Sequence, residues 1–279
     1  MTRSKVSREF LYTQEDFEYI KKLVHEESGI NLSDAKQDMV YSRLARRVRA
    51  LKIADFKQYC NYLDSHHQDE LVHAINAITT NLTHFFRENH HFDLLKQQII
   101  PEIVKQQPRG KRIRIWSAGC STGEEPYSIA ISLKDALPNY SQWDCKILAT
   151  DLDTNVIDTC NAGVYDNKRI EPIDERNAKR WFSPHPSHAN RVIIDNELKK
   201  DISFKQLNLI NDWPVKGPFD VIFCRNVVIY FDKPTQQKLF ARYYDLLAPS
   251  GYLLLGHSEQ LGQIQEKFNA LGKTSFQKK

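Results

Sequence analysis

The sequence lacks several features that mark other classes of protein. Its 279 residues contain no run of about 18 apolar residues, which excludes a membrane-spanning helix. The first ten residues have no apolar core of the kind found in signal peptides. The five cysteines are odd in number, scattered and without CxxC spacing, so neither a disulfide framework nor a structural zinc site is indicated. These absences favour a globular protein of the reducing cytoplasm.

A large excess of one charge sign is also missing, because the net charge is only +4. The basic residues are nevertheless concentrated: between Lys36 and Lys52, six of them stand against one acid, a local charge of +5. This stretch predicts a helix with Val40, Leu44, Val48 and Leu51 along one side. At about 100° per residue, four basic residues fall on an adjoining arc, which we call the basic arc: Lys36, Arg43, Arg46 and Arg47. The arc indicates an acidic partner, and a solvated helix face is the alternative.

Two patterns of organisation follow each other along the chain. Residues 1–80 predict a small domain of helices. Residues 81–111 predict a linker and a connecting helix, which Pro101 kinks or splits. Residues 112–279 alternate strands with helices, which predicts an α/β domain with a mostly parallel sheet covered on both faces.

An insert at about residues 163–206 interrupts this alternation. We interpret its two expected strands, Arg191–Ile194 and Ile202–Gln206, as parts of a small antiparallel β-subdomain. The end of the chain, around Thr274–Phe276, predicts an additional strand at the edge of the main sheet.

The α/β part opens with a strand, a loop of small residues and a helix. Arg112–Trp116 alternates basic and apolar residues as a strand does, and a helix is expected over Glu124–Leu137. Between them, Gly119 and Gly123 permit a tight turn and a close approach of the backbone to a ligand. This arrangement binds nucleotides and adenosyl cofactors in α/β folds. The loop is neither GxGxxG nor a P-loop, so it does not identify the ligand by itself.

Polar residues at the ends of two further strands are the next candidates. Asp151 directly follows an apolar strand, where an acid can accept both hydroxyl protons of an adenosyl ribose. Arg225, Asn226 and Tyr230 follow another apolar strand and require hydrogen-bond partners if they are buried. A ligand is one such partner. For Asp151, the alternative is a surface acid at a strand end. For the other three residues, the alternative is ordinary structural hydrogen bonds.

Other reactive residues show no arrangement of their own. The ten histidines lack metal-ligand spacing, and no Ser/His/Asp or Cys/His arrangement is visible, so we expect no metal. Cys120 in the loop is either an activated nucleophile or a small packing residue, and the second interpretation is favoured. Asn81, Thr83 and Arg87 form a polar connector whose role these residues alone leave open.

Several stretches resemble the CheR-type chemoreceptor glutamate O-methyltransferases. They follow the order of that family and cover nearly the whole chain: Asn81-Leu-Thr-His-Phe-Phe-Arg87, Trp116-Ser-Ala-Gly-Cys-Ser-Thr-Gly-Glu-Glu-Pro-Tyr-Ser-Ile-Ala130, Ala149-Thr-Asp-Leu-Asp153, Gly217-Pro-Phe-Asp-Val-Ile-Phe-Cys-Arg-Asn-Val-Val-Ile-Tyr-Phe231 and Gly256-His-Ser-Glu259. The resemblance implies an N-terminal helical receptor-recognition domain, a Rossmann-like class I S-adenosylmethionine-binding domain, and an inserted β-subdomain. It implies methyl transfer to glutamate side chains on the cytoplasmic domains of chemotaxis receptors. We expect a monomer that is recruited to membrane receptor arrays.

The resemblance also assigns residues. The expected cofactor-binding residues are Asn81, Thr83, Arg87, Gly119, Glu125, Asp151, Asn208, Leu209, Arg225 and Asn226. A sulfonium methyl and an ionised glutamate react without a metal or a general base, so the task left to the protein is to align them. Tyr230 and Arg87 are expected to orient the reacting groups. Three residues of the basic arc are expected to bind glutamate-rich receptor helices: Arg43, Arg46 and Arg47.

One departure from the family pattern and two competing functions stay open. In some members, the β-subdomain docks a C-terminal receptor peptide beside a glycine-bearing turn. Here the loop Ser183–Asn190 has no glycine, which favours direct recognition of receptor helices. An RNA methyltransferase would place the arginines on phosphates, but no aromatic-interleaved basic platform is present, so we expect no nucleic-acid partner. A catalytically silent receptor-binding adaptor is the third interpretation.

Overall fold

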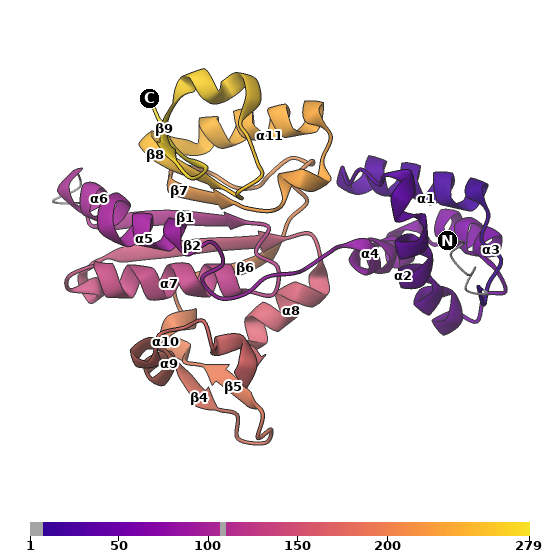
Figure 1. Cartoon of the computed structure of the whole chain (residues 1–279), viewed down its shortest axis with the longest axis horizontal. Coiled ribbons are helices and arrows are strands. Elements are labelled where there is room, and N and C mark those ends of the chain that lie inside the picture. The colour runs from indigo at the N-terminus through magenta and orange to yellow at the C-terminus, as the bar shows by residue number, and fades with distance from the viewer. Residues whose placement is uncertain (1–7, 107–109) are drawn as a thin grey trace, which may run out of the picture. The chain divides into compact units, whose positions relative to one another are not determined.

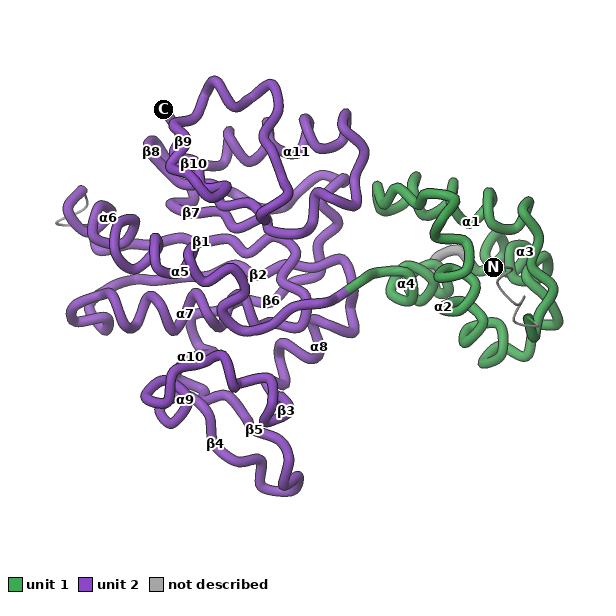
Figure 2. Tube along the Cα trace, in the orientation of Figure 1, with its two compact units in different colours: residues 1–80 green, residues 81–279 purple. Residues whose placement is uncertain are grey.

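The computed structural model describes residues 8–106 and 110–279. The chain forms two compact units, residues 1–80 and residues 81–279, which we call the N-terminal and C-terminal units (Figure 2). Residues 1–7, and residues 107–109 of the predicted linker, lie outside the described part. Within the described part, no helix is both long and apolar enough to cross a membrane.

The N-terminal unit consists of helices with clear start and stop residues. Thr13 begins α1 with a capping box, in which its hydroxyl accepts the Asp16 N–H and the Asp16 carboxylate accepts the Thr13 N–H. Gly29, at φ 73°, ends this helix in a left-handed turn. The elements are α1 (Gln14–Ser28), the 3-10 turn η1 (Asp34–Lys36), α2 (Gln37–Ala50), α3 (Phe56–Ser65) and α4 (His67–Ile78). Their core contains the predicted apolar stripe of α2, which is confirmed.

The C-terminal unit is organised around a seven-stranded sheet with the order β6-β2-β1-β7-β8-β10-β9 (Figure 1). Neighbours from β6 to β8 are parallel, whereas β10 is antiparallel to both β8 and β9. This confirms the mostly parallel sheet expected from the sequence. The strands are β1 (Arg112–Ala118), β2 (Asp144–Asp151), β6 (Ile202–Gln206), β7 (Phe219–Cys224), β8 (Leu247–Leu255), β9 (Phe268–Gly272) and β10 (Ser275–Lys278).

Helices cover both faces of this sheet. Ile113 and Ile115 of β1 pack in one core with α5, α6 and α7, whereas Trp116 packs in a second core with α11 (Figure 1). This alternation follows from the strand geometry, in which successive side chains point to opposite faces. The helices are α5 (His90–Leu94), α6 (Ile100–Gln106), α7 (Glu124–Ala136), α8 (Thr154–Ala162) and α11 (Lys233–Leu246).

The connecting helix continues through Pro101. A π-helical turn, η2 (Leu95–Ile99), separates α5 from α6, and Pro101 is the second residue of α6. Proline has no backbone N–H and its ring crowds the carbonyl group four residues earlier, so the regular hydrogen-bond ladder is interrupted here. The predicted kink or split is therefore a local π turn just before the proline.

The insert contains a separate antiparallel sheet with the order β3-β5-β4, which projects away from the main sheet (Figure 1). The expected β-subdomain is thus confirmed. Its elements are β3 (Val164–Asp166), η4 (Asn167–Ile170), α9 (Glu175–Trp181), β4 (Phe182–Pro184), β5 (Arg191–Ile194) and α10 (Asn196–Lys199).

Two strand assignments from the sequence are wrong. Ile202–Gln206 does not belong to the β-subdomain: as β6 it pairs in parallel with β2 at the edge of the main sheet. The alternation of apolar and polar residues in this segment suits an edge strand in either sheet, so the pattern does not show which strand it pairs with. Thr274–Phe276 is not at an edge, because β10 lies between β8 and the short strand β9, which the sequence analysis does not predict.

Candidate functional site

The loop after β1 lies where the strand order reverses, because β1 has β2 on one side and β7 on the other. Ligands of open α/β sheets bind at such a switch point, beyond the carboxyl ends of the strands. Gly119 opens this loop at φ 92°, and a Cβ atom there would stand 2.2 Å from Cγ2 of Val227 in the loop after β7. Glycine is required for the two loops to approach this closely.

The same loop is tied to the end of β2. The N–H groups of Gly119 and Cys120 donate to the Thr150 carbonyl oxygen, at 2.8 and 2.9 Å. The Ser121 N–H donates to Oδ2 of Asp151 at 2.8 Å, and the Asp153 N–H donates to Oδ1 at 3.0 Å. Burial raises the pKa of Asp151 to about 6. Each carboxylate oxygen still has a lone pair for another donor, so Asp151 can receive hydroxyl groups as the sequence predicts.

Glu125 lies in the first turn of α7 and faces a buried cation. Ser117 Oγ donates to its Oε1 at 2.7 Å, and Arg225 Nη1 donates to its Oε2 at 3.0 Å. Burial raises the pKa of Glu125, against the lowering effects of Arg225 and Ser117. Arg225 therefore supplies the positive charge that a buried carboxylate requires.

Arg225 connects the end of β7 to the segment that precedes α5. Besides Glu125, its guanidinium pairs with Glu88, with 3.3 Å between Nη2 and Oε2, and it donates to the Arg87 carbonyl oxygen. Its Nε is buried without a hydrogen-bond partner among the described residues. The structure thus places Arg225 at the predicted strand end, where its Nη atoms hold protein groups in position.

Glu88 joins several segments of this site, although the sequence analysis does not select it. Its Oε1 lies 3.1 Å from His257 Nδ1 and 3.4 Å from Asn226 Nδ2, while its Oε2 faces Arg225. Burial raises the pKa of Glu88, but Arg225 and His257 outweigh this effect and lower it to about 2. The carboxylate is therefore ionised. Its backbone, at φ 56°, is left-handed, a conformation that is often found at functional sites.

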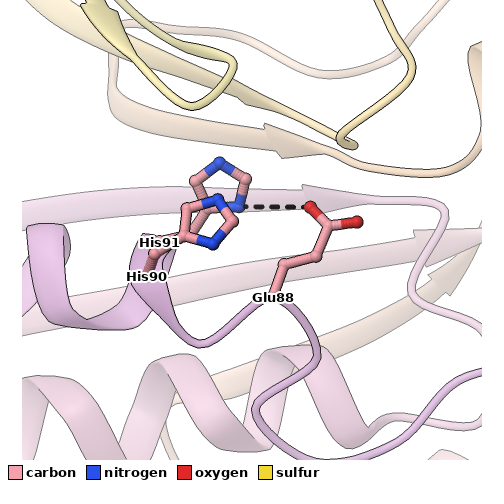
Figure 3. Close-up of side chains that lie close together, drawn as sticks. All are labelled: Glu88, His90 and His91. Carbon is pink, nitrogen blue, oxygen red and sulfur yellow. Dashed lines mark ion pairs between the residues drawn. The ribbon is translucent and has the colours of Figure 1, made fainter.

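Glu88 also belongs to a group of possible metal ligands with His90 and His91 (Figure 3). Their ligand atoms lie within 4.8 Å of one another, which the sequence spacing does not predict. Burial lowers the pKa of His91 to about 3, so its ring is neutral, and its Nε2 donates to the Lys273 carbonyl oxygen at 2.8 Å. Because Arg225 already balances the Glu88 charge, we assign this group to the ion-pair network.

Glu259 is a further residue of this site, in addition to the predicted set. Its carboxylate accepts the backbone N–H groups of Asn226, Val227, Val228 and Gly256, at 3.0, 2.9, 3.1 and 2.6 Å. It thereby shapes the loop after β7, in which Asn226 adopts φ 59°. In the sequence, the feature that could have indicated Glu259 is its position three residues after Gly256, which follows the apolar strand β8.

The connector before α5 runs along the loops after β1 and β2. Asn81 Nδ2 donates to Asp153 Oδ2 at 2.8 Å, and its carbonyl oxygen accepts Ser121 Oγ–H at 3.0 Å. The Thr83 carbonyl oxygen accepts a hydrogen bond from Arg169 Nη2 at 3.3 Å. The structure thus brings the predicted connector to the glycine loop.

Three further predicted residues lie in loops at the carboxyl ends of the strands. Tyr230 ends a 3-10 turn, η5 (Val228–Tyr230), that follows β7, and its side chain is partly buried. Asn208 and Leu209 follow β6, where Leu209 is buried and its carbonyl oxygen accepts hydrogen bonds from Trp213 and Arg242.

The basic arc is described within the N-terminal unit alone, and two of its arginines have partners there. Arg43 Nη1 donates to the carbonyl oxygens of Ile78 and Thr79 at the end of α4, at 2.5 and 2.6 Å. Arg47 forms a two-point ion pair with the buried Glu70, at 2.9 and 2.5 Å. Arg46 is exposed and has no hydrogen bond or ion pair within the described residues. Arg46 is therefore the arginine of the arc with a free head group.

Cys120 does not have the surroundings of a nucleophile. Its side chain is buried beside Cys160, and burial raises the pKa of its thiol well above the ordinary value. The packing interpretation is therefore confirmed.

The fold and the site together define a Rossmann-like protein of the kind that binds an adenosyl cofactor. Residues 81–277 match the "CheR methyltransferase, SAM binding domain", and residues 15–79 match the "CheR methyltransferase, all-alpha domain". The chain therefore belongs to the CheR methyltransferase family, and it is an S-adenosylmethionine-dependent methyltransferase.

Curated relatives align with nearly the whole chain. A probable chemotaxis protein methyltransferase of Rhizobium etli is 41% identical over 261 residues, which cover 91% of this chain and 96% of the relative. Chemotaxis protein methyltransferase 2 of Pseudomonas aeruginosa is 42% identical over 272 residues, with 97% and 95% covered. The chemotaxis protein methyltransferase of Escherichia coli is 42% identical over 264 residues, with 93% and 89% covered.

Proposed function

We propose that this methyltransferase transfers the methyl group of S-adenosylmethionine to glutamate side chains on the cytoplasmic domains of chemotaxis receptors. The observation that carries the proposal is the convergence of Glu125, Asp151 and Arg225 at the switch point of the sheet. The chemotaxis methyltransferases among the relatives support the choice of acceptor. The enzyme would act in chemotactic adaptation, as a cytoplasmic monomer recruited to receptor arrays.

The residues at this site fit the cofactor. Asp151 has free lone pairs for ribose hydroxyl groups, and the buried Nε of Arg225 has no hydrogen-bond partner among the described residues. We therefore retain the full predicted set as residues that bind S-adenosylmethionine: Asn81, Thr83, Arg87, Gly119, Glu125, Asp151, Asn208, Leu209, Arg225 and Asn226. Within this set, the contacts of Arg225 indicate that it acts by holding Glu125 and the Arg87 backbone.

The chemistry requires alignment more than proton transfer. Bound S-adenosylmethionine supplies a methyl group that its sulfonium already activates. The acceptor carboxylate is ionised near pH 7, since a glutamate has an ordinary pKa of about 4.3. The task of the protein is to orient the carboxylate and to exclude water. We assign the orienting role to Tyr230 and Arg87.

Replacing Tyr230 with phenylalanine tests this role. We expect kcat to fall about tenfold or more while the affinity for S-adenosylhomocysteine stays within about twofold, because only a hydrogen bond that orients the reacting groups is lost. Steady-state methylation assays and calorimetry measure the two quantities. Tyr244 is partly buried on α11, so Tyr244→Phe is a matched control. Full turnover by the Tyr230 variant would refute the assignment.

We propose that residues 1–80 recognise the receptor, that residues 81–111 connect, and that residues 112–279 bind the cofactor and carry the insert. Receptor helices around methylation sites are rich in glutamate, so the basic arc would attract them. Because Arg43 and Arg47 are held by partners of the N-terminal unit, we expect Arg46 to make the most direct contribution.

Arg46→Glu should therefore raise KM for receptor fragments by about tenfold, more strongly at low salt, and should leave S-adenosylhomocysteine binding unchanged. Arg49→Glu is the matched control, because Arg49 lies on the same helix but pairs with Glu9 instead of facing the arc. Methylation assays at two salt concentrations provide the measurement. Equal effects of the two substitutions would contradict the role of the arc.

Incubating the full chain with methyl-labelled S-adenosylmethionine and cytoplasmic receptor fragments separates the competing functions. We expect a label that is released as methanol on treatment with base, which is the property of a glutamyl methyl ester. Stable label on added RNA would support an RNA methyltransferase, and receptor binding without transfer would support an adaptor. Receptors with and without their C-terminal tails then show whether a tether is needed. The glycine-free loop between β4 and β5 favours a result in which the tail is dispensable.

A further inference from the structure

The insert reaches the glycine loop through one arginine. Arg169 lies in η4, directly after β3, and its Nη2 pairs with the carboxylate of Glu124 at the start of α7. The Glu124 side chain is 0% exposed, so it needs this cation. Arg169 Nη2 also donates to Thr122 Oγ1 at 3.3 Å, and Thr122 Oγ1 donates to Glu124 Oε2 at 2.7 Å. Arg169, Thr122 and Glu124 therefore form one closed polar group.

The same arginine reaches the connector that precedes α5. Its Nη2 lies 3.3 Å from the Thr83 carbonyl oxygen, so a single guanidinium joins the insert, the glycine loop and the connector. All three contacts involve the same nitrogen, Nη2, so this one atom lies where the three segments meet. Both joined segments contain expected cofactor-binding residues.

A second residue of the insert supports the same loop. Tyr165 of β3 is 2% exposed, and its hydroxyl donates to the Thr122 carbonyl oxygen at 2.7 Å. A Cβ atom on Gly123 would stand 2.8 Å from this hydroxyl, and Gly123 adopts φ 98°. The loop is thus packed against the insert without space for a side chain. Since Asp151 and Arg225 hold the neighbouring residues Ser121 and Glu125, the loop is fixed on both sides of Thr122–Glu124.

We propose that Arg169 is a positioning residue for the cofactor site, with Tyr165 in support, and that the insert is part of the methyltransferase machinery. This inference rests on the proposed role of the glycine loop and the connector in cofactor binding. Arg169 does not touch the reacting atoms in this account. It acts by holding Thr122, Glu124 and Thr83, and thereby sets the distance between loop and connector.

The alternative is that Arg169 only neutralises Glu124, and a set of variants of the full chain separates the two roles. Arg169→Ala removes all three contacts and leaves Glu124 unpaired. Arg169→Met combined with Glu124→Gln removes the charges together, so the stability of the fold returns while the link to Thr83 stays broken. Arg169→Lys keeps the charge on a side chain with a different length and head-group geometry. Arg176→Ala is the control, because Arg176 joins the insert to Asp135 on α7 at 3.0 Å, at the other end of that helix.

Calorimetric binding of S-adenosylhomocysteine and thermal unfolding without ligand are the two measurements. We expect Arg169→Ala and the double variant to bind S-adenosylhomocysteine about tenfold more weakly or worse, as loss of charge-assisted hydrogen bonds predicts. The double variant should recover the melting temperature of the wild type. The affinity of Arg169→Lys for S-adenosylhomocysteine should lie between those of the wild type and Arg169→Ala. Arg176→Ala should bind S-adenosylhomocysteine within about twofold of the wild type.

Recovery of both affinity and melting temperature in the double variant would overturn the inference, because Arg169 would then only balance a charge. Wild-type affinity in Arg169→Ala would overturn it as well. In both cases the proposed function would stand, because the wild-type chain binds the cofactor product. A wild-type chain that binds no S-adenosylhomocysteine would instead overturn the cofactor site, and this inference with it.

Discussion

Replacing Arg225 with alanine should lower the free energy of unfolding by about 3–5 kcal/mol, the usual cost of removing one partner of a buried ion pair. The Arg225 side chain is 2% exposed and stands between Glu88 and Glu125, which are 13% and 11% exposed. Without it, Glu125 stays buried with no cation beside it, and Glu88 keeps only its contact with His257. Because Arg225 also holds the Arg87 carbonyl oxygen, the variant should lose measurable binding of S-adenosylhomocysteine.

Chemical denaturation of the full chain and calorimetry measure these effects. Arg176→Ala removes an ion pair whose arginine is 73% exposed, so it should change the unfolding free energy by less than about 1 kcal/mol. If Arg225→Ala behaves like this control, the buried ion-pair network does not hold the site together.

Asp151→Asn should weaken S-adenosylhomocysteine binding about 100-fold, because two charge-assisted hydrogen bonds to ribose hydroxyl groups are lost. The wild type should also show a characteristic pH dependence. Burial raises the pKa of Asp151 to about 6, above its ordinary value near 3.8, so the carboxyl group is protonated below pH 6 in the free protein. Binding that needs the ionised form must then release this proton.

The affinity should therefore be constant above pH 6 and fall about tenfold per pH unit below it. Calorimetry between pH 5 and pH 8 measures this dependence, and Asp151→Asn is its control. Any titration that belongs to the ligand or to other residues persists in the variant, whereas the contribution of Asp151 disappears. Identical pH profiles of wild type and variant would show that Asp151 does not receive the ligand.

The elements that the sequence predicts well are those with local signals. Phe219–Cys224 is apolar apart from Asp220, and β7 has these bounds. Thr13 and Gly29 are local start and stop signals, and α1 lies between them. Asp151 ends β2 because the apolar strand itself ends there. The positions of the candidate site residues at strand ends could thus be predicted from pattern alone.

What could not be predicted depends on partners that are distant in the sequence. The pairing of β6 with β2 and the position of β10 between β8 and β9 are choices of neighbour, which a strand pattern does not encode. Glu88 looks like a surface acid in the sequence, and the motif that contains Glu259 does not reveal its partners. Only the fold brings Arg225 to Glu88 and four N–H groups to Glu259. In the same way, helical periodicity places Arg43 and Arg47 on the basic arc but cannot show that α4 already occupies them.

The central claim is methyl transfer from S-adenosylmethionine to glutamate side chains of chemotaxis receptors, and mapping the methylated residue tests it most directly. The full chain is incubated with methyl-labelled S-adenosylmethionine and a purified receptor cytoplasmic fragment, and the labelled peptide is identified by mass spectrometry. We predict a base-labile label on glutamate side chains, which disappears when those glutamates are replaced by alanine. A base-stable label, or a label on any other residue type, would contradict the account.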